Sequence, residues 1–253
     1  MAEAGLRVDR RGGLLLLTID REHRRNALDA ATSAAIDQAI GEAEADPAIG
    51  VVILTAVGDR AFCSGMDMKE AAAIGVGHGL VPGRGFAGIT ERRRTKPLIA
   101  AINGTAVAGG MEIALACDIV IAADHALFGL SEVKRGLFPF AGGVQRLARA
   151  VPRQTGLAMI LTGEALPAAR LHALGLITEV LPGADVLPRA IAIAEIILSH
   201  PQEAVRNAKL LFDHAADMPI DDSLRLGRAF GEATLGSVAS KEGVAAFAEG
   251  RAK

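Results

Sequence analysis

The sequence contains no tryptophan and no tyrosine, and its only aromatic side chains are eight phenylalanines among 253 residues. Proteins that bind single-stranded nucleic acid commonly stack bases on aromatic side chains along a basic surface. This chain offers few aromatics, and its formal net charge of −2 is slightly acidic. Composition therefore predicts no nucleic-acid partner and no general attraction to an anionic membrane.

Cysteine and long apolar runs are also scarce. The two cysteines, Cys63 and Cys117, lie far apart and have no second pair beside them. This excludes a disulfide framework or a cysteine metal site and suits a reducing compartment. Gly, Glu or Asp interrupts every apolar run before membrane-spanning length, and residues 1–13 lack the apolar core of a signal peptide. We therefore expect a cytoplasmic protein without a membrane partner.

What is present is a globular pattern, with 51% apolar and 22% charged residues. Short apolar runs bounded by glycine or charge predict buried strands, and they alternate with segments of helical periodicity. One helix is expected to begin at the N-cap Asp29, and another to start with Pro201 at its first position. The pattern predicts an α/β fold, with strands at 14–20, 50–58, 96–104, 117–124 and 176–182 and helices at 142–151, 154–163 and 201–217. We expect a core over 1–190 and a helical region over 191–253.

Residues 71–90 fit neither pattern. Their many glycines around Pro82 predict a mobile surface loop or a loosely formed helix. Gly83, Gly85 and Gly88 match the spacing of a dinucleotide-binding fingerprint, but that fingerprint needs a strand directly before it and a helix after it. We therefore reject a dinucleotide site here.

Two glycine-containing segments are candidates for binding an oxygen anion. In "AFCSGMD" (61–67), small residues and Gly65 allow close approach of a ligand, so that the amide of Met66 can face outward. In "AGGME" (108–112), Gly109 opens a helix whose first amides have no partner within the helix. Together the two amides would form an oxyanion hole, with each donor worth roughly 3–4 kcal/mol in the transition state. Alone, the first segment is equally an ordinary turn.

Two glutamates in apolar surroundings are candidates for acid and base chemistry. Glu112 follows the glycine pair, and Glu132 precedes a turn rich in glycine and proline at 139–143. Carboxyls on separate elements suit paired acid and base work on one water molecule. Either glutamate, taken alone, is also typical of a helix cap or a salt-bridge partner.

These motifs resemble the enoyl-CoA hydratase/isomerase (crotonase) superfamily. The resemblance is carried by 61–70, 96–122 and 128–147, in order and at the usual spacing, with "RRNALD" and "KEGVAAFAEGR" near the two ends. It implies a spiral of strand-strand-helix turns, a C-terminal helical trimerisation region and a homotrimer or dimer of trimers. The implied substrate is an acyl-CoA, so that coenzyme A is part of the substrate and no metal or other cofactor is needed. It implies an oxyanion hole of Met66 and Gly109, and substrate contacts from Arg25, Ser64, Met66, Asp67, Met68, Lys69, Gly109 and Phe140.

Both glutamate positions of the family's hydratases are filled here, by Glu112 and Glu132. The resemblance therefore implies hydration of a trans-2-enoyl-CoA, in which Glu112 activates water and Glu132 protonates the α-carbon. Phe140 and Ser131 stand where the family commonly has glycine and proline. Isomerisation, dehydration of a hydroxyacyl-CoA or a lyase step remain open alternatives. An RNA-binding member would rely on the basic run at 90–96, which we expect instead to be a solvated loop edge.

Overall fold

The computed structural model describes residues 4–249. The chain divides into two compact units, of which the first ends at Glu195 and the second begins at Ile196. Residues 1–3 and 250–253, which include the end of the motif at 241–251, lie outside the described residues. The predicted boundary at residue 190 falls inside helix α7 (Gly183–Leu198) and stays a prediction.

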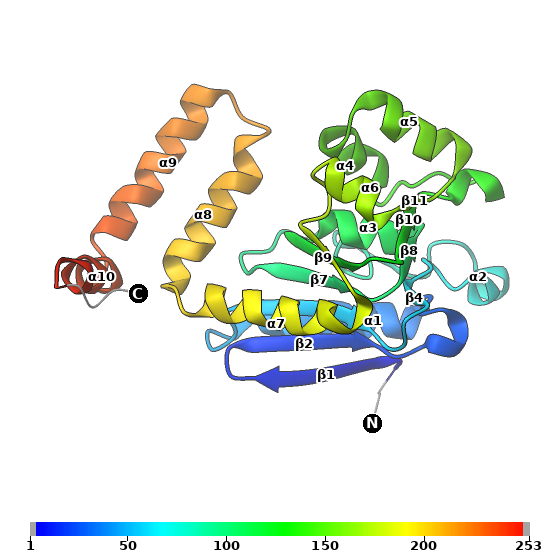
Figure 1. Ribbon diagram of the computed structural model, residues 1–253, viewed down its shortest axis with the longest axis horizontal. Coiled ribbons are helices and arrows are strands. Elements are labelled where there is room, and N and C mark those ends of the chain that lie inside the picture. Colours follow the sequence, from blue (N-terminus) through cyan, green and yellow to red (C-terminus); the bar gives the residue numbers. More distant parts are fainter. Residues whose placement is uncertain (1–3, 250–253) are drawn as a thin grey trace. The chain divides into compact units, whose positions relative to one another are not determined.

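The first unit is built on a sheet of six strands (Figure 1). Its first two strands form an antiparallel hairpin, and the remaining neighbours are parallel. Every residue of β3 and β7 is buried, as expected for strands that are covered on both faces. The five predicted strands are confirmed as members of this sheet. Its order is β1 (Leu6–Arg11), β2 (Leu14–Ile19), β3 (Val51–Ala56), β7 (Leu98–Ile102), β9 (Ile119–Ala123) and β12 (Glu179–Leu181).

A second sheet positions the candidate site. Its order is β11 (Leu166–Pro167), β10 (Leu127–Gly129), β8 (Thr105–Val107) and β4 (Ala61–Cys63). The last three run parallel, so their carboxyl ends lie along one edge. Directly after those ends come the three segments that carry the candidate residues, at 64–69, 108–112 and 131–135. The sheet therefore brings together segments that are distant in sequence.

The helices of the first unit begin and end close to the expected residues. The side chain of Asp29 accepts a hydrogen bond from the amide of Thr32 at 2.7 Å, which confirms it as the N-cap of α1. Strands and helices are joined by two 3-10 helices, η1 (Glu22–Arg24) and η2 (Glu132–Arg135). The α-helices are α1 (Ala30–Ala45), α2 (Met68–Ile74), α3 (Gly109–Ala116), α4 (Gly143–Ala150), α5 (Arg153–Thr162) and α6 (Ala168–Ala173).

The second unit is helical. It contains the end of α7, then α8 (Gln202–Ala215), α9 (Ile220–Leu235) and α10 (Val238–Ala248), of which α8 packs on α9. Pro201 was predicted to be the first helical residue of α8. It is the N-cap instead, so the helix begins one residue later than predicted. Proline is tolerated at either position, because neither needs an intrahelical N–H bond.

The expectation of a surface loop or loose helix over 71–90 is wrong for its second half. After α2, strands β5 (Leu80–Val81) and β6 (Gly85–Phe86) form a hairpin, and residues 86–90 are buried. The glycines permit this packing. Gly88 has φ +65°, and a Cβ there would lie 2.3 Å from Oδ1 of Asp37 on α1. A dinucleotide-binding fingerprint needs a helix directly after its last glycine. No helix follows Gly88 before β7, so the structure also speaks against a dinucleotide site here.

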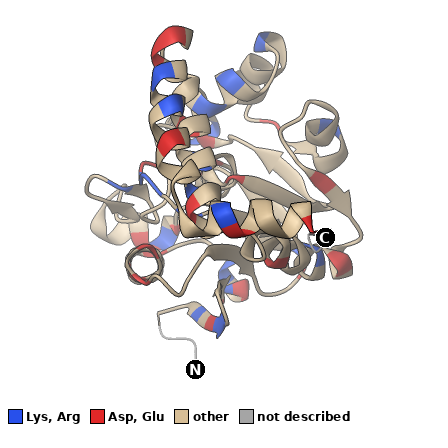
Figure 2. Cartoon of the chain, turned by 90° about the vertical axis from the view of Figure 1, so that its left-hand side faces the viewer, with Lys and Arg blue, Asp and Glu red and all other residues tan. Residues whose placement is uncertain are grey.

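The basic run at 90–96 is not the solvated edge that we expected. Arg94 and Lys96 are buried. The ammonium of Lys96 donates to the backbone carbonyls of Ala43 and Asp46, and Arg92 pairs with the carboxylate of Asp37. Backbone carbonyls and one carboxylate thus replace the water around these cations as the chain enters β7. Basic and acidic residues are interspersed along the ribbon in Figure 2. The basic run therefore gives no support to the RNA-binding alternative.

Candidate active site

A cavity of about 360 Å³ opens at the edge of the second sheet. Its wall comes from η1, the segments after β4, β8 and β10, the β5–β6 hairpin and the approach to α4. The structure brings every predicted site residue to this one cavity, namely Arg25, Ser64, Met66, Asp67, Met68, Lys69, Gly109, Glu112, Glu132 and Phe140.

The two predicted amide donors lie on backbone segments in direct contact. Gly65 has φ +91°, and a Cβ on it would lie 3.0 Å from the amide nitrogen of Gly109. A Cβ on Gly110 would lie 2.1 Å from the carbonyl oxygen of Cys63. Only glycine permits this approach. The contact places the Met66 and Gly109 segments side by side at the cavity.

Helix α3 starts from a strained residue. Ala108, its N-cap, has φ 52° and ψ −128°, a conformation that is rare for a residue with a Cβ. It is fixed by a hydrogen bond from its own amide to the carbonyl of Gly129 at 2.9 Å. Among residues 4–249, no group accepts a hydrogen bond from the amide of Met66 or Gly109. Two unpaired N–H groups, one at the positive end of a helix, can stabilise an oxygen anion.

Glu112, in the first turn of α3, is a buried carboxyl. The residue is 5% exposed, and its Oε1 accepts a hydrogen bond from the amide of Gly143 at 3.0 Å. The pKa of Glu112 is raised to about 7, chiefly by burial and also by the nearby Glu132, while the amide of Gly143 opposes the shift. A Cβ on Gly143 would lie 2.9 Å from that same Oε1. Glu112 can therefore gain or lose a proton near neutral pH.

Glu132 reaches the cavity from η2. Its Oε2 is buried and accepts no hydrogen bond from any residue in the described part of the chain. Burial raises its pKa, while its own amide and Arg135 oppose the shift. A half-buried carboxyl of this kind favours the protonated form. The cavity therefore holds two carboxyls, each of which burial biases toward carrying a proton.

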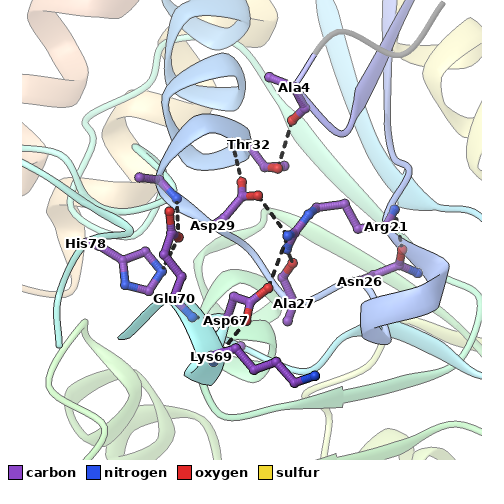
Figure 3. A network of polar contacts seen from close by, with 12 residues as sticks. Ala4, Arg21, Asn26, Ala27, Asp29, Thr32, Asp67, Lys69, Glu70 and His78 are labelled. Atoms are coloured by element: carbon purple, nitrogen blue, oxygen red, sulfur yellow. Dashed lines mark hydrogen bonds and ion pairs between the residues drawn. The ribbon is translucent and has the colours of Figure 1, made fainter. Parts of the chain in front are cut away.

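The segment after β4 is anchored by an arginine that sequence reasoning missed. Nη2 of Arg21 lies 3.0 Å from Oδ2 of Asp67 and 2.7 Å from Oδ2 of Asp29 (Figure 3). Asp67 also caps α2 by accepting a hydrogen bond from the amide of Lys69 at 3.0 Å. Burial acts to raise the pKa of Asp67, but Arg21 and the amides of Lys69 and Glu70 outweigh it, so the pKa lies below its usual value. Asp67 is thus held ionised.

The residues that line the cavity include basic and apolar side chains. Arg24, which we did not predict, lines it with Arg25 and Lys69. Arg25 has φ 53° at the end of η1, so the chain turns sharply there. Phe140 is 44% exposed, and its ring centroid lies 5.7 Å from that of Phe138, also unpredicted. The two rings thus lie side by side among the residues that line the cavity.

Two further properties of residues 4–249 bear on the site and its surroundings. No group of three or more His, Cys, Asp and Glu side chains among them is placed to hold a metal ion. None of the helices in this part of the chain has the length and apolar character needed to cross a membrane. Chemistry without metal or cofactor stays a prediction.

Known proteins resemble this chain over nearly its whole length. The profile of the enoyl-CoA hydratase/isomerase family matches residues 9–253. This chain belongs to that family. It is 37% identical over 250 residues to the enoyl-CoA hydratase EchA19 of Mycobacterium tuberculosis, covering 97% of this chain and 94% of the relative. It is also 37% identical over 251 residues to a carnitinyl-CoA dehydratase of Salmonella arizonae, covering 97% and 96%.

Solved structures agree with this assignment. A crystal structure of an enoyl-CoA hydratase from Mycobacterium tuberculosis superposes with a TM-score of 0.93 at 39% identity, covering 98% of this chain and 97% of that one. The crotonase-like α/β fold with C-terminal helices is therefore confirmed. Trimerisation and the individual roles of the site residues stay predictions.

Proposed function

We propose that this family member is a hydro-lyase that adds water to a trans-2-enoyl-CoA thioester and forms a 3-hydroxyacyl-CoA. The observation that carries the proposal is one cavity lined by two carboxyls, Glu112 and Glu132, and by the unpaired amides of Met66 and Gly109. Hydration needs a base for water, an acid for the α-carbon and a site for enolate charge. The cavity offers a candidate for each.

The reaction proceeds through an enolate. Ionised Glu112 accepts a proton from water while the water oxygen bonds to the β-carbon. The electron pair of the double bond moves toward the thioester carbonyl, whose oxygen accepts hydrogen bonds from Met66 and Gly109. Protonated Glu132 then donates its proton to the α-carbon. Transfer of one proton between the carboxyls, directly or through solvent, restores the starting state.

The remaining cavity residues bind the thioester. Arg25, with Arg24 beside it, supplies positive charge for the coenzyme A phosphates. Ser64 and the segment Met66, Asp67, Met68 and Lys69 line the coenzyme A side, and Asp67 acts by holding that segment on Arg21. Phe138 and Phe140 provide apolar surface for the acyl chain. Coenzyme A is part of the substrate, and we assign no metal or further cofactor.

Dehydration of a 3-hydroxyacyl-CoA is the second candidate, favoured by the similarity to a carnitinyl-CoA dehydratase. It is the reverse of the same steps and uses the same residues. The test is a screen of enoyl-CoA and hydroxyacyl-CoA thioesters of graded length and branching, with products identified by mass. Turnover of neither class, with binding intact, would contradict the proposal.

We also propose a cytoplasmic homotrimer or dimer of trimers. The support is apolar surface on the helices of the second unit, where Phe212, Leu235 and Phe247 are 82%, 72% and 79% exposed. A soluble protein rarely leaves such a set uncovered. Light scattering should give a multiple of three chains, whereas a clean monomer at micromolar concentration would contradict the assembly.

A further inference from the structure

Arg94, which is buried, and Arg146, which is half-buried, contact the elements around Glu112 without lining the cavity. Arg94 donates to the backbone carbonyl of Ile89 at 3.1 Å and to that of Ala116, the last residue of α3. Arg146, on α4, donates to the carbonyl of Thr90. The proposed reaction assigns neither a role. Moving a guanidinium even partly out of water is costly unless neighbouring groups compensate its charge, so the placement of both arginines needs a reason.

Arg146 packs against the turn at the start of α4, from which the hydrogen bond to Glu112 is donated. A Cβ on Gly142 would lie 1.9 Å from Nη1 of Arg146, so the guanidinium packs directly against this turn. The next residue, Gly143, donates its amide to Glu112. Through its bond to Thr90, Arg146 thus ties the turn that carries the donor to the segment that follows β6.

Arg146 also interacts electrostatically with Glu112. Burial lowers the pKa of Arg146, the positive charge of Arg94 lowers it further, and Glu112 acts in the opposite direction. The other charged group that acts on Glu112 is Glu132 on η2. Cys117 stays a neutral thiol, since burial raises its pKa to about 12. Arg94 also pairs with Asp118 at 3.9 Å, and Glu91 acts on Arg146 in the same direction as Glu112. Ionised Glu112 is therefore one of the negative groups that offset the positive charge of Arg146.

We infer that Arg146 is a positioning residue that favours the ionised form of Glu112. It fixes the turn from which Gly143 donates to the carboxyl, and its positive charge favours the ionised carboxylate. The base role of that carboxylate rests on the proposed function. The interaction between the charges of Arg146 and Glu112 does not rest on it. It is therefore tested by the free energy of unfolding and not by turnover.

The test compares unfolding free energies from pH 5 to pH 9 in the parent, Glu112→Gln, Arg146→Gln and the double variant. Because the folded pKa of Glu112 lies above its ordinary value of 4.5, its contribution to stability is complete below that value and is lost as pH rises through about 7. The difference in unfolding free energy between the parent and Glu112→Gln, taken at each pH, isolates this loss. In the Arg146→Gln background the same loss should move to higher pH, because an opposite charge is gone.

Arg92→Gln is the matched control. Arg92 is half-buried, as Arg146 is, with 10% side-chain exposure, but it pairs with Asp37 on α1. It should lower stability at every pH and leave the Glu112 loss where it is. An unchanged pH window in Arg146→Gln, equal to that of Arg92→Gln, would overturn the inference.

A failure of Arg146→Gln to fold would also test the inference. If Arg146→Gln does not fold but the double variant with Glu112→Gln does, Arg146 is needed because of the Glu112 charge, as inferred. If neither folds while Glu112→Gln alone does, Arg146 is only scaffold and the inference fails. An inactive parent would refute the proposed function and leave these stability results interpretable. In an active parent, Arg146→Lys should restore the pH profile of kcat/KM that Arg146→Gln shifts.

Discussion

The amide of Gly143 donates a hydrogen bond to Oε1 of Glu112 over 3.0 Å, between residues 31 positions apart. The bond joins the first turn of α4 to the first turn of α3 and fixes the carboxyl at the cavity wall. It also opposes the effect of burial, which favours the protonated acid. The pKa of about 7 reflects that balance, and a carboxyl so balanced is suited to exchange a proton with water at neutral pH.

The first prediction concerns pH. If Glu112 must be ionised to accept a proton from water, kcat/KM should fall as pH drops below about 7, the pKa of that carboxyl. A base with an ordinary carboxyl pKa would remain active down to about pH 4–5. The measurement is kcat/KM for an enoyl-CoA between pH 5 and pH 9. A profile that stays flat down to pH 5 would rule out Glu112 as the titrating base.

The second prediction separates the carboxyls from the scaffold. Glu112→Gln and Glu132→Gln should each lower turnover by about 10²–10⁴-fold, the usual range for a positioned acid or base. Both should still bind acyl-CoA, since the oxyanion hole is backbone. The double variant should lose much less than the product of the single losses, because the two act as a unit. The exposed Glu164→Gln is the control and should behave like the parent.

One outcome of that series would favour another reaction. If Glu132→Gln turns over normally while Glu112→Gln is inactive, Glu132 is structural. A reaction with a single base, such as double-bond isomerisation, then becomes the better account.

The third prediction tests the backbone contact at the oxyanion hole. Gly65→Ala places a Cβ 3.0 Å from the amide nitrogen of Gly109 at a residue with φ +91°. It should lower kcat by about 10²–10³-fold, as loss of one oxyanion donor does. Gly83→Ala is the control, because Gly83 also has a positive φ, +70°, but has no atom within 4 Å of its would-be Cβ. Equal activity in the two variants would show that the contact is unimportant for catalysis.

The fourth prediction concerns the network around Arg21. Its side chain and that of Asp67 are 12% and 8% exposed, so removing the cation leaves a buried carboxylate without its partner. Arg21→Met should therefore lower the unfolding free energy by about 3–5 kcal/mol. Arg7→Met removes a pair with Asp20 in which the arginine is 55% exposed, and it should cost at most about 1 kcal/mol. Urea denaturation measures both; equal losses would refute the anchoring role.

Much of the fold is predictable from local sequence because its main elements have strong local signals. The apolar runs of β2, β3, β7 and β9 can only be buried, and Asp29 has a side chain that caps a helix. The strands that position the site are different. β4, β8 and β10 have three residues each, too short for any periodicity, and only their pairing with one another makes them strands.

The candidate site divides in the same way. Glycine-containing segments and two glutamates mark it in the sequence, and the resemblance to the family adds the substrate contacts. The cavity collects every predicted site residue. Arg21 and Arg146 carry no local signal, because their partners are distant in sequence. Charge patterning also misleads at 90–96, where backbone carbonyls and Asp37 replace solvent around the cations. The roles of the site residues stay predictions until they are measured.

The central claim is tested most directly by asking whether the oxygen atom of water enters the product. Purified protein is incubated with trans-2-hexenoyl-CoA in ¹⁸O-labelled water with a metal chelator present, and the products are identified by mass. We predict 3-hydroxyhexanoyl-CoA that carries one ¹⁸O in its hydroxyl group, formed by the parent and nearly absent with Glu112→Gln. A product of unchanged mass with a shifted double bond, or no turnover until metal is restored, would contradict the account.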